Sequence, residues 1–283
     1  MEPNSALEGF DSSRRWEIVA VRYGRLRTQR SDVYLNYREY GEPDGDQTVD
    51  YFFWIVRDAE QTFVIDTGFS RAGAERRNRE LLIPVPEALR TLGIPPDGDV
   101  ELVLTHGHYD HCGNIDYFPD QPVHMSSAEH AFWTGPDADH RQFYGIIDPE
   151  IVHQLTALDE AGRLRRIVGW SELAPGLRLV EIPGHTPGQL VALVSTEEGT
   201  ILLASDAVHF SEELDRDLPF KHVTDLIGMY RGFEVIRRWR DDGVVSLVVP
   251  GHDATAIAGY PPLAGELSQH ATVIGSGRKR DQP

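Results

Sequence analysis

Four side chains that commonly bind metal ions lie within six residues of one another, in the run His106–His111, which reads HGHYDH. His106 and His108, two residues apart, can point to the same side of an extended segment or turn. Asp110 and His111 can then face a second position a few ångströms away. Neutral imidazole nitrogen and carboxylate oxygen suit Zn²⁺ and other first-row divalent metals. The spacing therefore predicts a site for two metal ions rather than one.

Three further residues of this kind also follow the ends of predicted strands. They are His185 after strand 177–182, Asp206 after strand 200–205, and His252 after strand 244–249. The HGHYDH run likewise begins where a predicted strand ends. In layered α/β structures, ligands bind at strand ends, where loops converge. These four blocks therefore predict one site that is assembled from distant parts of the chain.

The elements that must position these residues are predicted from hydrophobic periodicity and from runs of β-branched residues. The expected strands are Trp16–Tyr23, Tyr51–Arg57, Thr62–Asp66, Val100–Thr105, Pro122–Met125, Leu177–Ile182, Gln189–Ser195, Thr200–Ser205 and Val244–Val249. The clearest expected helix is Asp225–Arg240, with Thr224 as its N-cap and one apolar face, formed by Leu226, Met229, Tyr230, Phe233 and Ile236. Grouped strands followed by strands that alternate with helices predict sheets covered by helices on their outer faces.

The composition is that of a globular protein, with 40% apolar and 25% charged residues. The formal net charge is −18, and the only lysines are Lys221 and Lys279. Because an acidic surface repels phosphate backbones, we do not expect nucleic acid as a partner. Such a surface favours neutral or cationic small substrates over polyanions, although a metal site can reverse this locally.

The single cysteine, Cys112, excludes an internal disulfide and fits a reducing compartment. Met1–Arg15 contains no apolar signal-peptide segment, and the longest apolar runs are too short to cross a bilayer. We therefore expect a soluble cytoplasmic protein without a membrane partner, either monomeric or a homodimer. No linker-like change in composition divides the chain, which predicts one domain over 15–274, a flexible N-terminus over 1–14 and a flexible tail over 275–283.

The order of these motifs resembles the signature of the metallo-β-lactamase superfamily, His-x-His-x-Asp-His followed by a lone His, a lone Asp and a final His. The resemblance extends from Val64–Gly68 to His252. It implies an α/β fold, a four-layered αβ/βα sandwich with the metals at one edge of the two sheets. It also implies how the ligands are shared: His106, His108 and His185 hold the first metal, Asp110, His111 and His252 hold the second, and Asp206 bridges both. The expected cofactors are two zinc ions, with iron, cobalt or manganese as other divalent candidates.

Within the superfamily, the chain is most similar to N-acyl-homoserine lactonases and the related pyridoxolactonases. The bridging position is Asp206, no ligand is a cysteine, and Pro250–Asp253 resembles the corresponding lactonase block. One position departs from this pattern. The best-known lactonases have a tyrosine three residues after the bridging aspartate, and this chain has His209. His209 could donate a hydrogen bond to the substrate or pack beside the site, and both interpretations stay open.

The resemblance implies hydrolysis by a metal-bridging hydroxide, which would attack the carbonyl carbon of a small-molecule lactone or ester. Asp110 is expected to serve as a ligand and as a proton shuttle to the leaving oxygen. His209 and Tyr109 are expected as nearby catalytic donors. Asp66 is expected to anchor a ligand imidazole from behind, and Cys112 to pack beneath the site.

The expected substrate-binding residues are His209, His222 and Trp133. The segment Ser126–Glu160 contains four aromatic residues, which either cap the site and receive an acyl chain or pack among their own helices. Phe52–Trp54 is expected in the sheet core.

A dinuclear metal-dependent hydrolase that opens lactones, with N-acyl-homoserine lactones as the leading substrates, is the function that these features favour. The nearest alternative is hydrolysis of another lactone, an ester or a thioester. An iron-dependent oxidoreductase with the same ligands is a second alternative. A non-catalytic metal-binding module is a third alternative, which predicts a missing ligand or a blocked pocket, and all seven ligand positions are filled.

Overall fold

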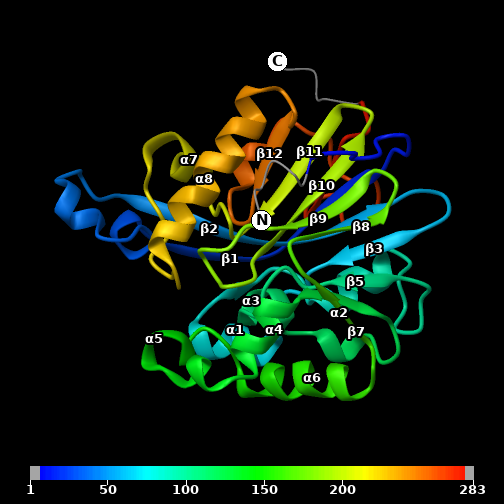
Figure 1. Ribbon diagram of the computed structural model, residues 1–283, viewed down its shortest axis with the longest axis horizontal. Helices are drawn as coiled ribbons and strands as arrows, with labels where there is room; N and C mark the ends of the chain where they lie inside the picture. Colours follow the sequence, from blue (N-terminus) through cyan, green and yellow to red (C-terminus); the bar gives the residue numbers. More distant parts are fainter. Residues whose placement is uncertain (1–6, 278–283) are drawn as a thin grey trace.

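Two β-sheets lie face to face in the computed structural model, which describes residues 7–277 (Figure 1). The first sheet contains β1 (Glu17–Gln29), β2 (Asp46–Arg57), β3 (Thr62–Ile65), β4 (Glu80–Leu81), β5 (Glu101–Val103), β6 (Val123–Ser126), β7 (Leu164–Ile167) and β13 (Ala271–Ile274). The second contains β8 (Trp170–Ala174), β9 (Leu177–Glu181), β10 (Leu190–Thr196), β11 (Gly199–Ser205) and β12 (Leu247–Pro250). Their strand orders are β13-β1-β2-β3-β5-β6-β7, with β4 paired to β1, and β12-β11-β10-β9-β8. The second sheet is thus built from one continuous stretch of chain.

Helices cover the outer faces of both sheets. One group lies on the side of the first sheet and consists of α1 (Arg71–Arg77), α2 (Val85–Thr91), α3 (Tyr109–Cys112), α4 (Ser127–Trp133), α5 (Arg141–Tyr144) and α6 (Pro149–Glu160). The other group lies on the side of the second sheet and consists of α7 (Ser211–Arg216) and α8 (Leu226–Asp241) (Figure 1). This arrangement confirms the predicted four-layered αβ/βα sandwich.

The strands alternate side chains between two buried faces, and this alternation explains the layers. In β2, Phe52 and Trp54 belong to the apolar cluster between the sheets, whereas Phe53 belongs to the cluster beneath the first group of helices. In β10, Leu190 faces the other sheet and Val191 faces α8. Every residue of β10 is buried, so a continuous apolar run is what this strand requires. The prediction that Phe52–Trp54 lies in the sheet core is confirmed.

All nine predicted strands are present, but their bounds differ from the prediction. β1 and β2 continue past their apolar parts into a polar hairpin, which pairs as far as Gln29 with Asp46. β12 begins at Leu247 instead of Val244. Four short strands, β4, β7, β8 and β13, were not predicted, because sequences such as the Leu164–Ile167 segment, LRRI, carry no clear alternation.

The predicted helix Asp225–Arg240 is confirmed as α8, but its predicted N-cap was wrong. Asp225 caps the helix by accepting a hydrogen bond from the Gly228 amide. The Thr224 hydroxyl instead donates to the carbonyl of Gly184, 3.0 Å away. The start of α8 therefore holds the loop that precedes His185, and Met229 and Phe233 bury its apolar face.

Both ends of the described chain contact the sandwich. Arg178 donates to the carbonyls of Glu8 and Gly9, and Arg14 pairs with Asp58. At the other end, the Glu197 amide donates to the Gly275 carbonyl at 3.1 Å. Residues 1–6 and 278–283 of the two predicted flexible ends lie outside the described residues, and the domain bounds stay a prediction. Within 7–277, no helix combines the length and apolar character needed to cross a bilayer.

Candidate metal centre

The seven side chains predicted as metal ligands, called the metal-type residues below, come from both sheets and reach one edge of the sandwich. On the first sheet, β5 leads into the loop that carries His106 and His108, and α3 carries Asp110 and His111 on its first turn. The second sheet contributes the other three, which are His185 between β9 and β10, Asp206 directly after β11 and His252 after β12. Ser205, with a φ of 44°, turns the chain sharply at the end of β11. The structure therefore brings together all seven residues predicted as ligands.

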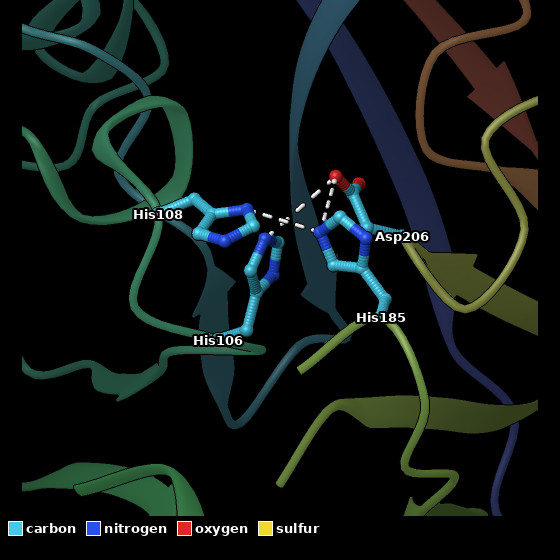
Figure 2. A group of neighbouring side chains, drawn as sticks. All are labelled: His106, His108, His185 and Asp206. Atoms are coloured by element: carbon cyan, nitrogen blue, oxygen red, sulfur yellow. Dashed lines mark hydrogen bonds and ion pairs between the residues drawn. The ribbon is translucent and has the colours of Figure 1, made fainter. Parts of the chain in front are cut away.

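These residues fall into two groups, and within each group the candidate ligand atoms lie within 4.8 Å of one another. The first group is His106, His108, His185 and Asp206, and the second is Asp110, His111 and His252. Figure 2 shows the first group, in which Oδ2 of Asp206 lies 3.4 Å from Nε2 of His185 and 3.7 Å from Nε2 of His106.

Asp206 also reaches the second group, where Oδ2 lies 3.2 Å from Nε2 of His252 and Oδ1 approaches two histidines. Oδ1 of Asp206 lies 3.3 Å from Nε2 of His111 and 3.1 Å from Nε2 of His252. Oδ2 of Asp110 is 4.0 Å from Nε2 of His111 and 3.9 Å from Nε2 of His252. The grouping is the one that the resemblance implied, with Asp206 between the two sets.

The donor atoms fit divalent metal ions. Nε2 of His106, Nε2 of His111 and Oδ1 of Asp206 are buried and have no hydrogen-bond partner. Leaving such atoms unsatisfied costs about 1–3 kcal/mol each, and an ion coordinated by each group would satisfy them. Imidazole nitrogen and carboxylate oxygen match the preference of zinc and other first-row metals.

Burial prepares the first group for coordination. It lowers the pKa values of His106, His108 and His185 well below the ordinary range of histidine, so these imidazoles keep a free lone pair. For His111, burial opposes protonation, but the carboxylates of Asp206, Asp66 and Asp110 outweigh it and raise the pKa. The second group therefore offers a strongly negative environment in which a cation is stabilised.

Asp66 lies behind the imidazole of His111, a predicted ligand, and holds its orientation. Its Oδ2 accepts a hydrogen bond from Nδ1 of His111 at 2.7 Å, and its Oδ1 accepts one from the Thr105 amide at 2.8 Å. Asp66 is fully buried and has a left-handed φ of 65°, a conformation that aspartate tolerates better than most residues. Nδ1 of His252 likewise donates to the Asp50 carbonyl at 2.8 Å. These bonds leave Nε2 of both imidazoles directed at the centre.

A buried carboxylate that the sequence did not single out connects two of the ligand loops. Glu129, in α4, accepts hydrogen bonds from the Gly107 amide at 2.8 Å and the Gly188 amide at 2.9 Å. It also accepts one from the Trp133 indole. No sequence pattern indicates this role, because Glu129 resembles an ordinary acidic residue in the first turn of a helix.

Trp133 does not lie where a substrate contact was expected. Its side chain is 1% exposed, its ring contacts His108, and it does not line the cavity of about 670 Å³ that opens onto the predicted ligands. A β-carbon on Gly107 would come within 2.2 Å of it. Phe132 packs on Phe143 with ring centroids 5.2 Å apart, so these two rings pack among the helices of their own segment, whereas Tyr144 is 65% exposed. The expectation that Trp133 binds substrate is therefore corrected: Trp133 supports the His108 loop.

His209 is also placed differently from the expected substrate donor. It is fully buried, it does not line the cavity, and Phe220 stacks on it at a centroid distance of 3.9 Å. Its Nε2 faces Asp206 and its Nδ1 faces the buried carboxylate of Glu213. Of the two interpretations, the geometry favours packing beside the site, and Glu213 is a partner that the sequence did not reveal.

Cys112 packs beneath the metal-type residues, as expected. Its Sγ donates to the His106 carbonyl at 3.0 Å, and burial raises the pKa of its thiol. A buried neutral thiol is a poor nucleophile.

A cavity of about 670 Å³ opens onto the centre. Five of the seven metal-type residues line it, namely His108, Asp110, His185, Asp206 and His252. Tyr109 and His222 also line it, whereas residues that lie deeper, such as His106, do not. Tyr109 and His222 therefore lie where a substrate could reach them, and their catalytic and substrate-binding roles stay predictions.

Residues 47–257 match the family model described as the metallo-beta-lactamase superfamily. The chain belongs to this superfamily. An N-acyl homoserine lactonase of Bacillus sp. is 30% identical over 135 residues, which cover 47% of this chain and 48% of that protein. The chain thus aligns with about half the length of that relative. The acyl-coenzyme A thioesterase MBLAC2 of Gallus gallus is 28% identical over 222 residues, covering 70% of this chain and 71% of that protein.

Solved structures of this superfamily share the fold. The crystal structure of a quorum-quenching N-acyl homoserine lactone lactonase superposes with a TM-score of 0.69 at 20% sequence identity, covering 87% of this chain and 95% of that one. Similarity at this level supports the fold alone.

Proposed function

We propose that this superfamily member is a metal-dependent hydrolase that opens lactone rings, with N-acyl-homoserine lactones as the first substrates to test. The observation that carries the proposal is the position of Asp206. Its carboxylate lies between the two groups and lines an open cavity, with Oδ2 3.4 Å from Nε2 of His185 and Oδ1 3.3 Å from Nε2 of His111. The lactonase relative supports the choice of a lactone.

The proposed cofactors are two divalent ions, with zinc as the first candidate. His106, His108 and His185 would hold one ion, Asp110, His111 and His252 the other, and Asp206 would contact both. When bound, such a pair lowers the pKa of water and stabilises negative charge on a carbonyl oxygen.

The side chains around the centre supply the remaining functions. Asp110 lines the cavity with a side chain that is 10% exposed, so it can accept a proton from a bound nucleophile and return it to the leaving oxygen. The Tyr109 hydroxyl lies 3.4 Å from the Tyr51 hydroxyl, and both side chains line the cavity. We assign Tyr109 the role of a hydrogen-bond donor to the substrate, and His222 a place in the substrate wall.

Thioester hydrolysis is the second candidate. The alignment with the thioesterase MBLAC2 covers a larger share of this chain than the alignment with the lactonase, 70% against 47%. Attack on the carbonyl carbon is common to both reactions, so the centre itself does not distinguish a lactone from a thioester.

The test is a hydrolysis screen of zinc-loaded protein against N-acyl-homoserine lactones of several chain lengths, aromatic lactones and acyl thioesters. Asp206→Asn is the matched control and should lose activity on every substrate. Opening of at least one lactone supports the proposal, and turnover of thioesters alone selects the second candidate. Activity on neither class would overturn both. Metal analysis of protein purified without added metal tests the iron-dependent oxidoreductase alternative, because redox chemistry requires a metal such as iron.

A further inference from the structure

The cavity above the candidate metal centre is lined by cations that form no ion pair with a carboxylate among the described residues. Arg79 and Lys221 are half-buried and line the cavity, and neither forms an ion pair with any residue in the range 7–277. Arg77, which lies beside them, differs because it pairs with Asp148 at 2.8 Å. Arg141 lies at the exposed rim and is likewise unpaired within this range. Since the whole chain has a net charge of −18, this local excess of positive charge is unusual.

Arg79 is held in position by neutral partners. Its Nε donates to the Tyr109 hydroxyl at 3.1 Å, and its Nη1 donates to the Arg77 carbonyl at 2.6 Å. These bonds fix the guanidinium without cancelling its charge. The carboxylate that acts on it is Asp110, which the proposed function assigns to a metal. Arg79 is therefore a preorganised charge beside the proposed reaction centre.

The backbone of Lys221 is held by hydrogen bonding, and the residue lines the cavity. Its amide donates to the Val33 carbonyl at 2.9 Å, and the preceding residue, Phe220, forms an isolated β-bridge with Tyr34. Burial lowers the pKa of Lys221, and Asp32, which also lines the cavity, partly opposes this effect. His222 adds no positive charge, because burial and the neighbouring Lys221 lower its pKa to about 4.

Half-burying two cations without a carboxylate in direct contact is unfavourable unless a ligand compensates the charge. A neutral acyl-homoserine lactone would not compensate it. We propose that the natural substrate carries an anionic group, a carboxylate or a phosphate, which binds Arg79 and Lys221 while the scissile carbonyl lies over the metal centre. This inference rests on the proposed hydrolase function and narrows its substrate class.

The kinetic test uses three γ-lactones with side chains of equal length that end in a methyl, a carboxylate or a phosphate monoester. With zinc-loaded protein we expect kcat/KM to be at least tenfold higher for an anionic lactone than for the methyl one. The ratio of kcat/KM for the anionic lactone to that for the methyl lactone should fall about tenfold in Lys221→Met, chiefly because KM for the anionic lactone rises. Lys221→Arg should retain the wild-type ratio. The matched control Arg90→Gln removes an exposed arginine outside the cavity that lies over the Tyr117 ring and forms no ion pair within residues 7–277, and it should leave the ratio unchanged.

A binding measurement tests the inference independently of turnover. Calorimetric titration with hexyl phosphate, hexanoate and hexanol should give tighter binding of at least one anion, weakened about tenfold by Lys221→Met and by high salt. The preferred anion identifies phosphate or carboxylate. Equal or better turnover of the methyl lactone, or anion binding that Lys221→Met does not change, would overturn the inference and leave the hydrolase proposal intact. If no lactone or thioester is hydrolysed but the Lys221-dependent binding is found, the proposed function fails and the anion site stands.

Discussion

Nε2 of His209 lies 3.2 Å from Oδ2 of Asp206, and His209 does not line the open cavity. Nδ1 of the same imidazole lies 3.2 Å from Oε1 of Glu213, whose side chain is fully buried. Burial opposes a charge on His209, but Asp206 and Glu213 outweigh it and raise the pKa of His209 to about 9. The imidazole therefore connects two buried carboxylates, and it fixes the orientation of the residue that both metal groups share.

Replacing His209 by phenylalanine should destabilise the protein by about 3 kcal/mol, because it keeps the stacking on Phe220 but leaves Glu213 buried without its partner. Urea unfolding in the presence of a chelator measures this change apart from metal binding. In a double-mutant cycle with Glu213→Leu, the double variant should lose less stability than the sum of the single variants. Strict additivity would show that the two side chains do not act as a pair.

Metal content should follow the two groups of ligands. Wild-type protein is expected to bind two equivalents of zinc, His106→Asn and His252→Asn about one each, and Asp206→Asn fewer than either single-group variant. Mass spectrometry of metal content after dialysis measures these ratios. Zinc at about a hundred times its Kd should also stabilise the fold by about 2.7 kcal/mol over chelated protein. Unchanged stoichiometry in both single variants would refute the assignment of the groups.

Asp66→Asn should weaken metal binding without removing a proposed ligand. The hydrogen bond to Nδ1 of His111 loses its charged acceptor, and asparagine still tolerates the left-handed backbone. An effect of about 10-fold to 100-fold on the affinity of the second group is expected from comparable supporting residues. Competition with a chromophoric chelator measures it. Asp159→Asn, at an exposed ion pair with Arg166, is the control and should bind zinc like wild type.

Gly107→Ala should disrupt the loop between the first two histidines. A β-carbon at Gly107 would lie 2.2 Å from the Trp133 ring, which requires one of the two to move. Overpacking of this kind should cost about 3 kcal/mol and should lower zinc affinity through His108. Gly259→Ala, where a β-carbon meets nothing within 4 Å, is the control. Thermal denaturation should show that adding Trp133→Leu restores part of the lost stability; no recovery would place the cause elsewhere.

The metal-type residues were predictable because each follows a strand, and strand ends converge in a layered fold. The supporting residues were not, since their partners lie far away in the sequence. Glu129 is 59 residues from Gly188, and only the folded chain shows that its carboxylate accepts that amide. Likewise, nothing in the sequence near His209 indicates that Phe220 covers it. The burial of an imidazole depends on what packs over it, which local patterns do not encode.

The short strands that were not predicted also depend on distant partners. β7 lies at the edge of the first sheet, where two exposed arginines separate its buried residues, and its pairing with β6 determines that it is a strand. The Asp225 cap was missed by one residue because Thr224, an equally good capping residue, is already engaged with the Gly184 carbonyl.

Because the second sheet is one uninterrupted stretch of chain, from β8 to β12, it contributes His185, Asp206 and His252 as a unit, while the first sheet contributes the HGHYDH loop. Each proposed ion would therefore cross-link two parts of the chain that are otherwise held together by their apolar interface and by the pairing of β13 with β1. Cutting the chain between β7 and β8 should give two fragments that reassociate more tightly with zinc than without it. Metal binding would then stabilise the association of the two parts of the chain, and zinc affinity would measure how completely they have assembled.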